Sequence, residues 1–235
     1  MKIDIYDSNG KKKGTQDLPE EIFCAPINEG LMHLALLRQQ SNRRIAVAHV
    51  KSRGEIKCST AKLYRQKGTG RARRGSASAN ILRGGAKAFV PRNIRNFTKD
   101  MPRKMRKSSL KSCLSYSAKN GRIFGLEGYN GESKTKSFVE LLSKLPVDMG
   151  RKTIFVLSEK IENLEIASRN VSGVRTIKAE YLNPEDVLGA WNLVFVGDSI
   201  DKTTNMLKSS DSDEKSQKID ASASSASSVS SKSSK

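Results

Sequence analysis

No apolar stretch in the sequence approaches the roughly 20 residues that a membrane-spanning helix needs. Residues 1–6 alternate polar and apolar side chains, which predicts a strand and not a secretory signal peptide. The same residues lack the arginine-rich, acid-poor composition of an organelle transit peptide. We therefore expect a cytoplasmic chain with no membrane partner, and an organellar location stays open if a transit peptide has been removed.

Cysteine and histidine are also scarce. The three cysteines, Cys24, Cys58 and Cys113, are scattered and form no CxxC pair, which predicts reduced thiols and no zinc site. Neither His33 nor His49 has a second histidine, a cysteine or a carboxylate at a metal-binding spacing. The sequence thus predicts no metal, no cofactor, no catalytic residue and no small-molecule substrate.

Acidic residues are nearly missing from the middle of the chain. Between Arg43 and Lys107 there are twenty lysines and arginines, opposed only by Glu55 and Asp100, so this segment has a net charge of +18. The whole chain has a net charge of +19, which leaves +1 for all the other residues. Such a concentrated cation attracts a polyanion, with nucleic acid as the leading candidate and an anionic membrane as the second.

The residues on both sides of this segment alternate between strand and helix patterns, and several strands are continuously apolar. That alternation predicts an α/β fold, a three-layer α/β/α domain with a mostly parallel sheet. Strands are expected at 3–5, 123–126, 153–157, 174–177 and 191–196. Helices are expected at 29–39, 102–121, from 133 onward, around 164–167, from 183 and at 198–207.

The predicted helices have expected apolar faces. In chain order these faces comprise Leu31, Leu34, Ala35 and Leu37; then Met105, Leu110, Cys113, Leu114 and Tyr116; then Phe138, Val139, Leu141 and Leu142. The predicted organisation is a globular domain of residues 1–41 and 100–207, with residues 42–99 inserted in it as an extended basic loop. Residues 208–235, rich in Ser, Ala and Lys, predict a disordered tail.

The insert carries three basic blocks. The first, residues 62–76, mixes glycines with arginines and lysines; glycine lets the backbone approach a phosphate, and arginine both pairs with phosphate and stacks on bases. The second, residues 83–92, combines a Gly-Gly reversal with Phe89 and a proline that keeps the return path extended. The third, residues 102–107, is a basic first helical turn that opposes the helix dipole, which favours a phosphate neighbour.

Simpler interpretations of these blocks stay open. The alternative for the first block is a solvated flexible loop, and the alternative for the third is a solvated helix face. Gly68-Thr69-Gly70 imitates the start of a dinucleotide fingerprint, but Arg73 stands at the third glycine position and no strand and helix flank the motif. A loop of this length inside a compact domain is reasonable when a partner orders it.

The residues expected to bind RNA share a basic, glycine, polar or aromatic character within these blocks and their arms. They are Arg43, Arg44, Lys51, Arg53, Lys57, Lys62, Tyr64, Arg65, Gln66, Lys67, Gly68, Thr69, Gly70, Arg71, Arg73, Arg74, Ser76, Arg83, Gly84, Gly85, Lys87, Phe89, Arg92, Arg95, Arg103, Lys104, Arg106 and Lys107.

The string from Arg65 to Arg73, RQKGTGRAR, resembles a motif of the bacterial type of the ribosomal large-subunit protein four family. Gly75-Ser76, the Arg83-Gly84-Gly85 block with Phe89, and the basic helix that leads to residues 110–112 match the family at the same spacing. The resemblance covers most of residues 1–207. The family's usual Lys-Pro-Trp is Lys62-Leu63-Tyr64 here, and its Pro and Trp before the Arg-Gly-Gly are replaced around residues 79–82.

This resemblance implies a structural constituent of the large ribosomal subunit that binds 23S-type rRNA early in 50S assembly and contacts several of its domains. It implies that the loop forms part of the polypeptide exit tunnel wall, with a tip at Arg65, Lys67, Gly68, Gly70 and Arg71. The implied partners are rRNA, neighbouring large-subunit proteins at the tunnel and the nascent polypeptide. The alternatives are a free-standing RNA chaperone or regulator, and a nucleotide-dependent enzyme on a doubly wound sheet.

Overall fold

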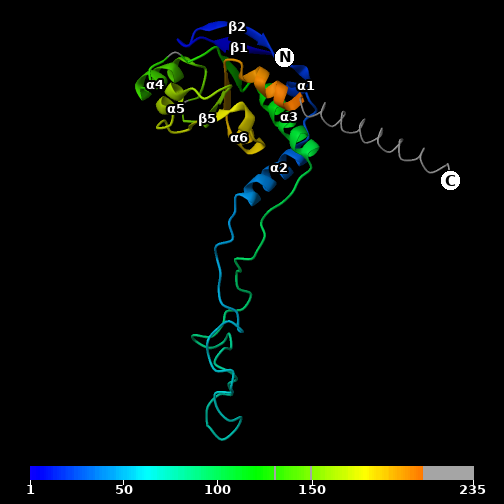
Figure 1. Cartoon of the computed structure of the whole chain (residues 1–235), viewed down its shortest axis with the longest axis vertical. Helices are drawn as coiled ribbons and strands as arrows, with labels where there is room; N and C mark the ends of the chain where they lie inside the picture. The colour runs from blue at the N-terminus through cyan, green and yellow to red at the C-terminus, as the bar shows by residue number, and fades with distance from the viewer. Residues whose placement is uncertain (130, 149, 209–235) are drawn as a thin grey trace, which may run out of the picture. The chain divides into compact units, whose positions relative to one another are not determined.

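The computed structural model describes residues 1–129, 131–148 and 150–208 (Figure 1). The described chain forms two compact units, one from residues 1–37 together with those from 101 onward, and the other from Arg38–Asp100. Most of the predicted tail, residues 209–235, lies outside the described residues.

The first unit contains a single six-stranded sheet with the strand order β2-β1-β3-β6-β4-β5. All its strand pairs are parallel except β1 with β2, which are antiparallel. This arrangement confirms the predicted mostly parallel sheet. The strands are β1 (Lys2–Tyr6), β2 (Lys12–Asp17), β3 (Ile123–Leu126), β4 (Thr153–Leu157), β5 (Val174–Lys178) and β6 (Asn192–Val196).

The helices lie in the connections between the strands, except for a last segment that follows β6. They are α1 (Glu20–Phe23), α2 (Glu29–Asn42), α3 (Arg103–Lys119), α4 (Thr135–Lys144), α5 (Glu162–Ser168) and α6 (Pro184–Gly189), with a 3-10 turn, η1 (Ala179–Tyr181), and a final helical segment at 199–208. Asn28 caps the start of α2, because its side-chain oxygen accepts a hydrogen bond from the amide of Leu31 at 3.0 Å.

Two hydrophobic clusters cover the two faces of the sheet, and successive residues of a strand alternate between them. Ile154 and Val156 of β4 belong to the cluster that holds the buried side chains of α1, α3 and α6. Phe155 and Leu157 belong to the cluster that holds those of α4 and α5. Every residue of β4 and β6 is therefore buried, which explains their continuous apolar sequences and confirms the predicted α/β class.

Several local expectations were wrong. The strand β2 and the helix α1 were not predicted from the sequence, and α4 begins at Thr135, two residues later than expected. Some side chains assigned to buried helix faces are substantially exposed: Leu34 (54%), Leu37, Met105, Tyr116 and Val139. The amphipathic pattern correctly predicted that these helices exist. It did not predict that fewer of their apolar side chains are buried than the pattern suggests.

Serines, not only apolar side chains, attach α3 to the chain before it. Ser115 is buried and its hydroxyl donates to the carbonyl of Ile22 at 3.0 Å, while the hydroxyl of Ser112 donates to the carbonyl of Pro26 at 2.9 Å. Between them in sequence lies Cys113, which is fully buried, and burial raises the pKa of its thiol to about 12. This face of α3 thus packs closely against backbone, where small side chains fit.

Across the residues that the structure describes, none of the helices combines the length and the apolar character needed to cross a membrane.

Candidate nucleic-acid interface

The second unit contains no helix or strand between Arg43 and Asp100 beyond one isolated bridge, between Lys62 and Ser76. Its two arms are drawn in blue to cyan and in green in Figure 1. Separate hydrogen bonds and an ion pair join them. A segment without regular structure needs such contacts because it has no ladder of backbone hydrogen bonds of its own.

The base of the insert is closed by side-chain amide and hydroxyl groups at the end of α2. The amide of Lys99 donates to the side-chain oxygen of Asn42 at 2.7 Å, and the side-chain nitrogen of Asn42 donates back to the carbonyl of Lys99 at 3.2 Å. The hydroxyl of Ser41 donates to the carbonyl of Phe97 at 2.6 Å. Side chains at the end of α2 therefore form hydrogen bonds with the backbone of the second arm, in place of the backbone pairing that a strand would provide.

Glu55, the only carboxylate between Arg43 and Lys99, joins the two arms further along. One guanidinium nitrogen of Arg92 donates to both of its oxygens, at 2.6 and 2.8 Å, and the amide of Ser52 donates at 2.8 Å. The Arg92 hydrogen bonds and then the Ser52 amide stabilise the charged form, so they lower the pKa of Glu55 to about 2. One acid in a strongly basic segment thus connects its arms.

A compact group of turns follows at residues 76–86. The amide of Ala86 donates to the carbonyl of Ser78 at 3.2 Å, and both residues are buried. Arg53 of the first arm donates to the hydroxyl of Ser78 at 3.4 Å. A side chain on Gly85 would place its Cβ 2.0 Å from the carbonyl oxygen of Ala79, so this turn requires glycine.

The tip of the insert is a small closed loop of residues 62–76. The amide of Leu63 donates to the carbonyl of Gly75 at 3.1 Å, and the phenol of Tyr64 donates to the carbonyl of Ala72. At the end of the loop the Arg65 guanidinium donates to the carbonyl of Gly68 at 3.0 Å. Gly68 has a φ of 80°, in the region that favours glycine. Tyr64, one of the residues expected to bind RNA, therefore also closes the loop with its hydroxyl.

Most of the residues expected to bind RNA lie on the surface of the chain. Those that are half-buried instead of exposed are Tyr64, Thr69, Ser76, Gly85, Arg92 and Lys107. Lys107 differs from the others in that its ammonium group is buried and has no hydrogen-bond partner among the described residues. It lies with Arg103, Lys104 and Arg106 on α3, which belongs to the first unit.

Exposed apolar side chains form a second feature of the insert, one that was not predicted from the sequence. Ile45, Val47, Ile81 and Ile94 are each at least 78% exposed. Phe89, which was singled out, is fully exposed and has a φ of 49°, a conformation that L side chains rarely adopt. Large apolar side chains held open in this way mark a surface that a partner covers. The sequence signal that could have identified these residues is an isolated large apolar side chain within a basic segment that has no helical or strand periodicity.

Substitution of Glu55 by Gln is expected to separate the arms. The lowered pKa means that the ion pair stabilises the closed arms above the ordinary glutamate pKa of about 4.3 and loses this effect as pH falls toward about 2. Spin labels at Lys51 and Asn93, with Cys24 and Cys58 replaced by Ser, should broaden each other's spectra at pH 7. The Glu55→Gln change should largely remove this broadening, and high salt should weaken it because the pair is exposed.

The matched control for this experiment is Glu127→Gln, which removes an exposed ion pair in the other unit, between Lys13 and Glu127. It should leave the spectra unchanged. Broadening that persists in Glu55→Gln at pH 7 would show that other contacts hold the arms together.

Another candidate site, in the α/β unit, is a pocket of about 350 Å³ at the carboxyl ends of β1, β3 and β6. The chain leaves β3 toward α4 on one face and leaves β6 toward the 199–208 segment on the other, the arrangement at which doubly wound sheets bind ligands. The rim, however, is acidic, with Glu127, Asp198 and Asp201 around a single lysine, Lys13.

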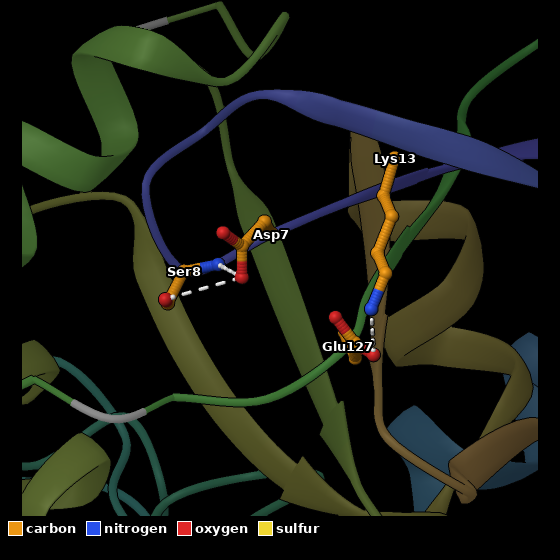
Figure 2. Close-up of polar contacts among 4 residues, drawn as sticks. All are labelled: Asp7, Ser8, Lys13 and Glu127. Atoms are coloured by element: carbon orange, nitrogen blue, oxygen red, sulfur yellow. Dashed lines mark hydrogen bonds and ion pairs between the residues drawn. The ribbon is translucent and has the colours of Figure 1, made fainter.

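Figure 2 shows that the ammonium of Lys13 points to the Glu127 carboxylate, 2.6 Å away, and this contact raises the lysine pKa. In the turn nearby, Asp7 accepts hydrogen bonds from the amide and the hydroxyl of Ser8, at 2.7 and 3.3 Å. The cation at this pocket is thus already neutralised, which makes the rim unfavourable for a polyphosphate. Gly68-Thr69-Gly70 lies at the tip loop, away from any strand-to-helix turn, so it does not build a dinucleotide site.

Within residues 1–129, 131–148 and 150–208, no three or more His, Cys, Asp and Glu side chains are grouped so as to hold a metal ion.

Comparison with known proteins adds to this geometry. Residues 16–206 match the model of the ribosomal protein L4/L1 family. The large ribosomal subunit protein uL4 of Desulfatibacillum aliphaticivorans is 35% identical over 201 residues, which are 85% of this chain and 96% of that protein. The uL4 proteins of Halothermothrix orenii and Pelotomaculum thermopropionicum are also 35% identical, over 86% and 84% of this chain and 96% and 95% of their own lengths. The chain therefore belongs to the ribosomal protein L4/L1 family.

Proposed function

We propose that this chain is a structural, non-catalytic constituent of the large ribosomal subunit, located in the ribosomes of the cytoplasm. In this proposal it binds 23S-type rRNA early in 50S assembly and contacts several rRNA domains. The relatives that match this chain are named uL4, and the match spans nearly the whole length of each relative. Both facts support the ribosomal assignment.

The observation that carries the proposal is the surface of residues 38–100. This unit has a large excess of exposed cations over its two carboxylates, Glu55 and Asp100, and Glu55 joins the two arms of the insert. Two carboxylates are too few to neutralise the seventeen lysines and arginines of this unit. Phosphate neutralisation with release of counterions should supply most of the binding free energy, so affinity should fall steeply with salt. The exposed Phe89 and arginines provide planes on which unpaired bases stack.

We further propose that the tip loop forms part of the wall of the polypeptide exit tunnel. The tip residues Arg65, Lys67, Gly68, Gly70 and Arg71 are exposed. The contacts across residues 62–76 hold this short loop closed without a core of its own. Neighbouring large-subunit proteins and the nascent polypeptide would then be its partners besides RNA.

Sedimentation of a cell lysate that contains the tagged full-length chain tests the proposal. The protein should co-migrate with large subunits and with their assembly precursors, and it should remain there after a wash in moderate salt. A matched chain with nine glutamines in place of the lysines and arginines of residues 60–92 should stay at the top of the gradient. If the unmodified protein never migrates with large subunits or their precursors, it is a free-standing RNA-binding protein and the ribosomal assignment is wrong.

A further inference from the structure

The amino edge of the sheet carries a basic cluster that lies outside the insert. Arg122 comes immediately before β3, Arg151 lies two residues before β4, and Trp191 comes immediately before β6. Because β6 lies between β3 and β4, the register of the sheet brings the three residues together. The guanidinium carbons of both arginines lie 3.8 Å from the centre of the Trp191 ring, so the two arginines flank the indole.

The backbone beneath this cluster is fixed by hydrogen bonds between its segments. The amide of Trp191 donates to the carbonyl of Lys152 at 2.7 Å, and the amide of Leu193 donates to the carbonyl of Arg122 at 2.8 Å. The three side chains therefore stand at an end of the sheet that backbone hydrogen bonds hold together. Stacking on the indole restricts each guanidinium, which lowers the entropy lost when a ligand binds to it.

The charges of the cluster are largely uncompensated. Arg151 lies 3.8 Å from the carboxylate of Asp148, a distant contact between two side chains that are each more than half exposed, so it is worth little. Arg122 makes no ion pair with a carboxylate in the part of the chain that the structure describes. Trp191 is itself 37% exposed, so solvent and ligands reach the cluster.

We propose that Arg122, Trp191 and Arg151 form a second RNA-binding surface, which receives an unpaired nucleotide of a structured RNA. Each guanidinium has one face on the indole, and its other face is suited to stack on a base. The N–H groups at its edge are suited to donate to a phosphate. This inference rests on the proposed RNA-binding function. It concerns the α/β unit, whose residues would bind the RNA in addition to those of the insert.

Trp191 is the only tryptophan of the chain, so its fluorescence reports on this surface alone. The full-length chain is titrated with protein-free large-subunit rRNA, and quenching of Trp191 by acrylamide is measured with and without RNA. Quenching should fall severalfold when RNA covers the ring. In parallel, the variant R122Q/R151Q should bind the RNA about tenfold more weakly. Its salt dependence, the slope of log K against log salt, should be smaller by about 1.4 for two lost phosphate contacts.

The control variant K160Q/K178Q removes two charges at the opposite, carboxyl ends of β4 and β5, and it should keep the salt slope of the unmodified chain. R122K/R151K keeps both charges but lacks the planar group, so it should recover the slope and not the protection of Trp191. Unfolding midpoints are measured for each variant, since a merely structural cluster would change stability and leave the salt slope unaltered.

Three outcomes overturn the inference in distinguishable ways. If RNA binds tightly but Trp191 quenching and the R122Q/R151Q slope are unchanged, this surface does not bind RNA, and the proposed function still stands. If the chain binds no rRNA at low salt, the proposed function and this inference both fail. If polyglutamate protects Trp191 and RNA does not, the surface serves an acidic protein partner.

Discussion

Deletion of residues 60–92 is expected to leave the α/β unit folded and to weaken binding to large-subunit rRNA by about a hundredfold or more at low salt. The deleted segment contains nine lysines and arginines and the whole tip loop. Folding should survive because no residue of either hydrophobic cluster lies between Met32 and Leu110. Circular dichroism and filter binding over a salt series measure the two effects.

A full-length chain with the same nine positions changed to Gln separates charge from chain length. It should lose most of the salt dependence, since each lost phosphate contact lowers the slope by about 0.7 to 0.9. Loss of helical and strand signals on deletion would show that the insert contributes to the folding of the α/β unit. Unchanged affinity in both variants would show that the insert is not where the RNA binds.

Phe195→Ala is expected to lower the free energy of unfolding by about 3–5 kcal/mol, a large share of the total stability of a domain this size. Phe195 is 1% exposed in β6 and meets Phe23 of α1 edge to face, with ring centres 6.2 Å apart. Truncation therefore leaves a cavity between the central strands and the helices on that face. Urea unfolding followed by circular dichroism and by the fluorescence of Trp191 gives the value.

Phe89→Ala is the matched comparison, because the same side chain is removed from a fully exposed position of the insert. Its effect on unfolding should be within about 0.5 kcal/mol, while its affinity for rRNA should fall about tenfold through lost stacking. Equal destabilisation by the two substitutions would contradict the division between a buried core and an open binding surface.

How much of this fold the sequence predicted depends on the element. The strands β3 and β4 lie at the predicted residues because both are short, apolar and bounded by polar segments. The edge strand β2 was missed because its sequence, KKGTQD, has no apolar alternation. It is held by backbone pairing with β1, for instance Ile3 opposite Gln16, and such pairing depends on tertiary structure.

The candidate interface was likewise predictable only in part from the sequence. Its cations were predictable from composition, since charge is visible residue by residue. The contacts that shape it, such as Asn42 with Lys99 and Glu55 with Arg92, join residues far apart in sequence and follow no periodic pattern. The cluster of Arg122, Trp191 and Arg151 depends on the strand order β3-β6-β4, which no local pattern encodes.

The open apolar side chains of the insert have a consequence for the life of the protein in a cell. A newly made copy displays Ile45, Val47, Ile81, Phe89 and Ile94 to water beside many sites for trypsin-like proteases. Until RNA covers them, these side chains are available for aggregation and the backbone beside them for cleavage. We therefore expect copies made in excess of their RNA to be degraded first, which would match the number of surviving molecules to the number of RNA molecules that can bind them.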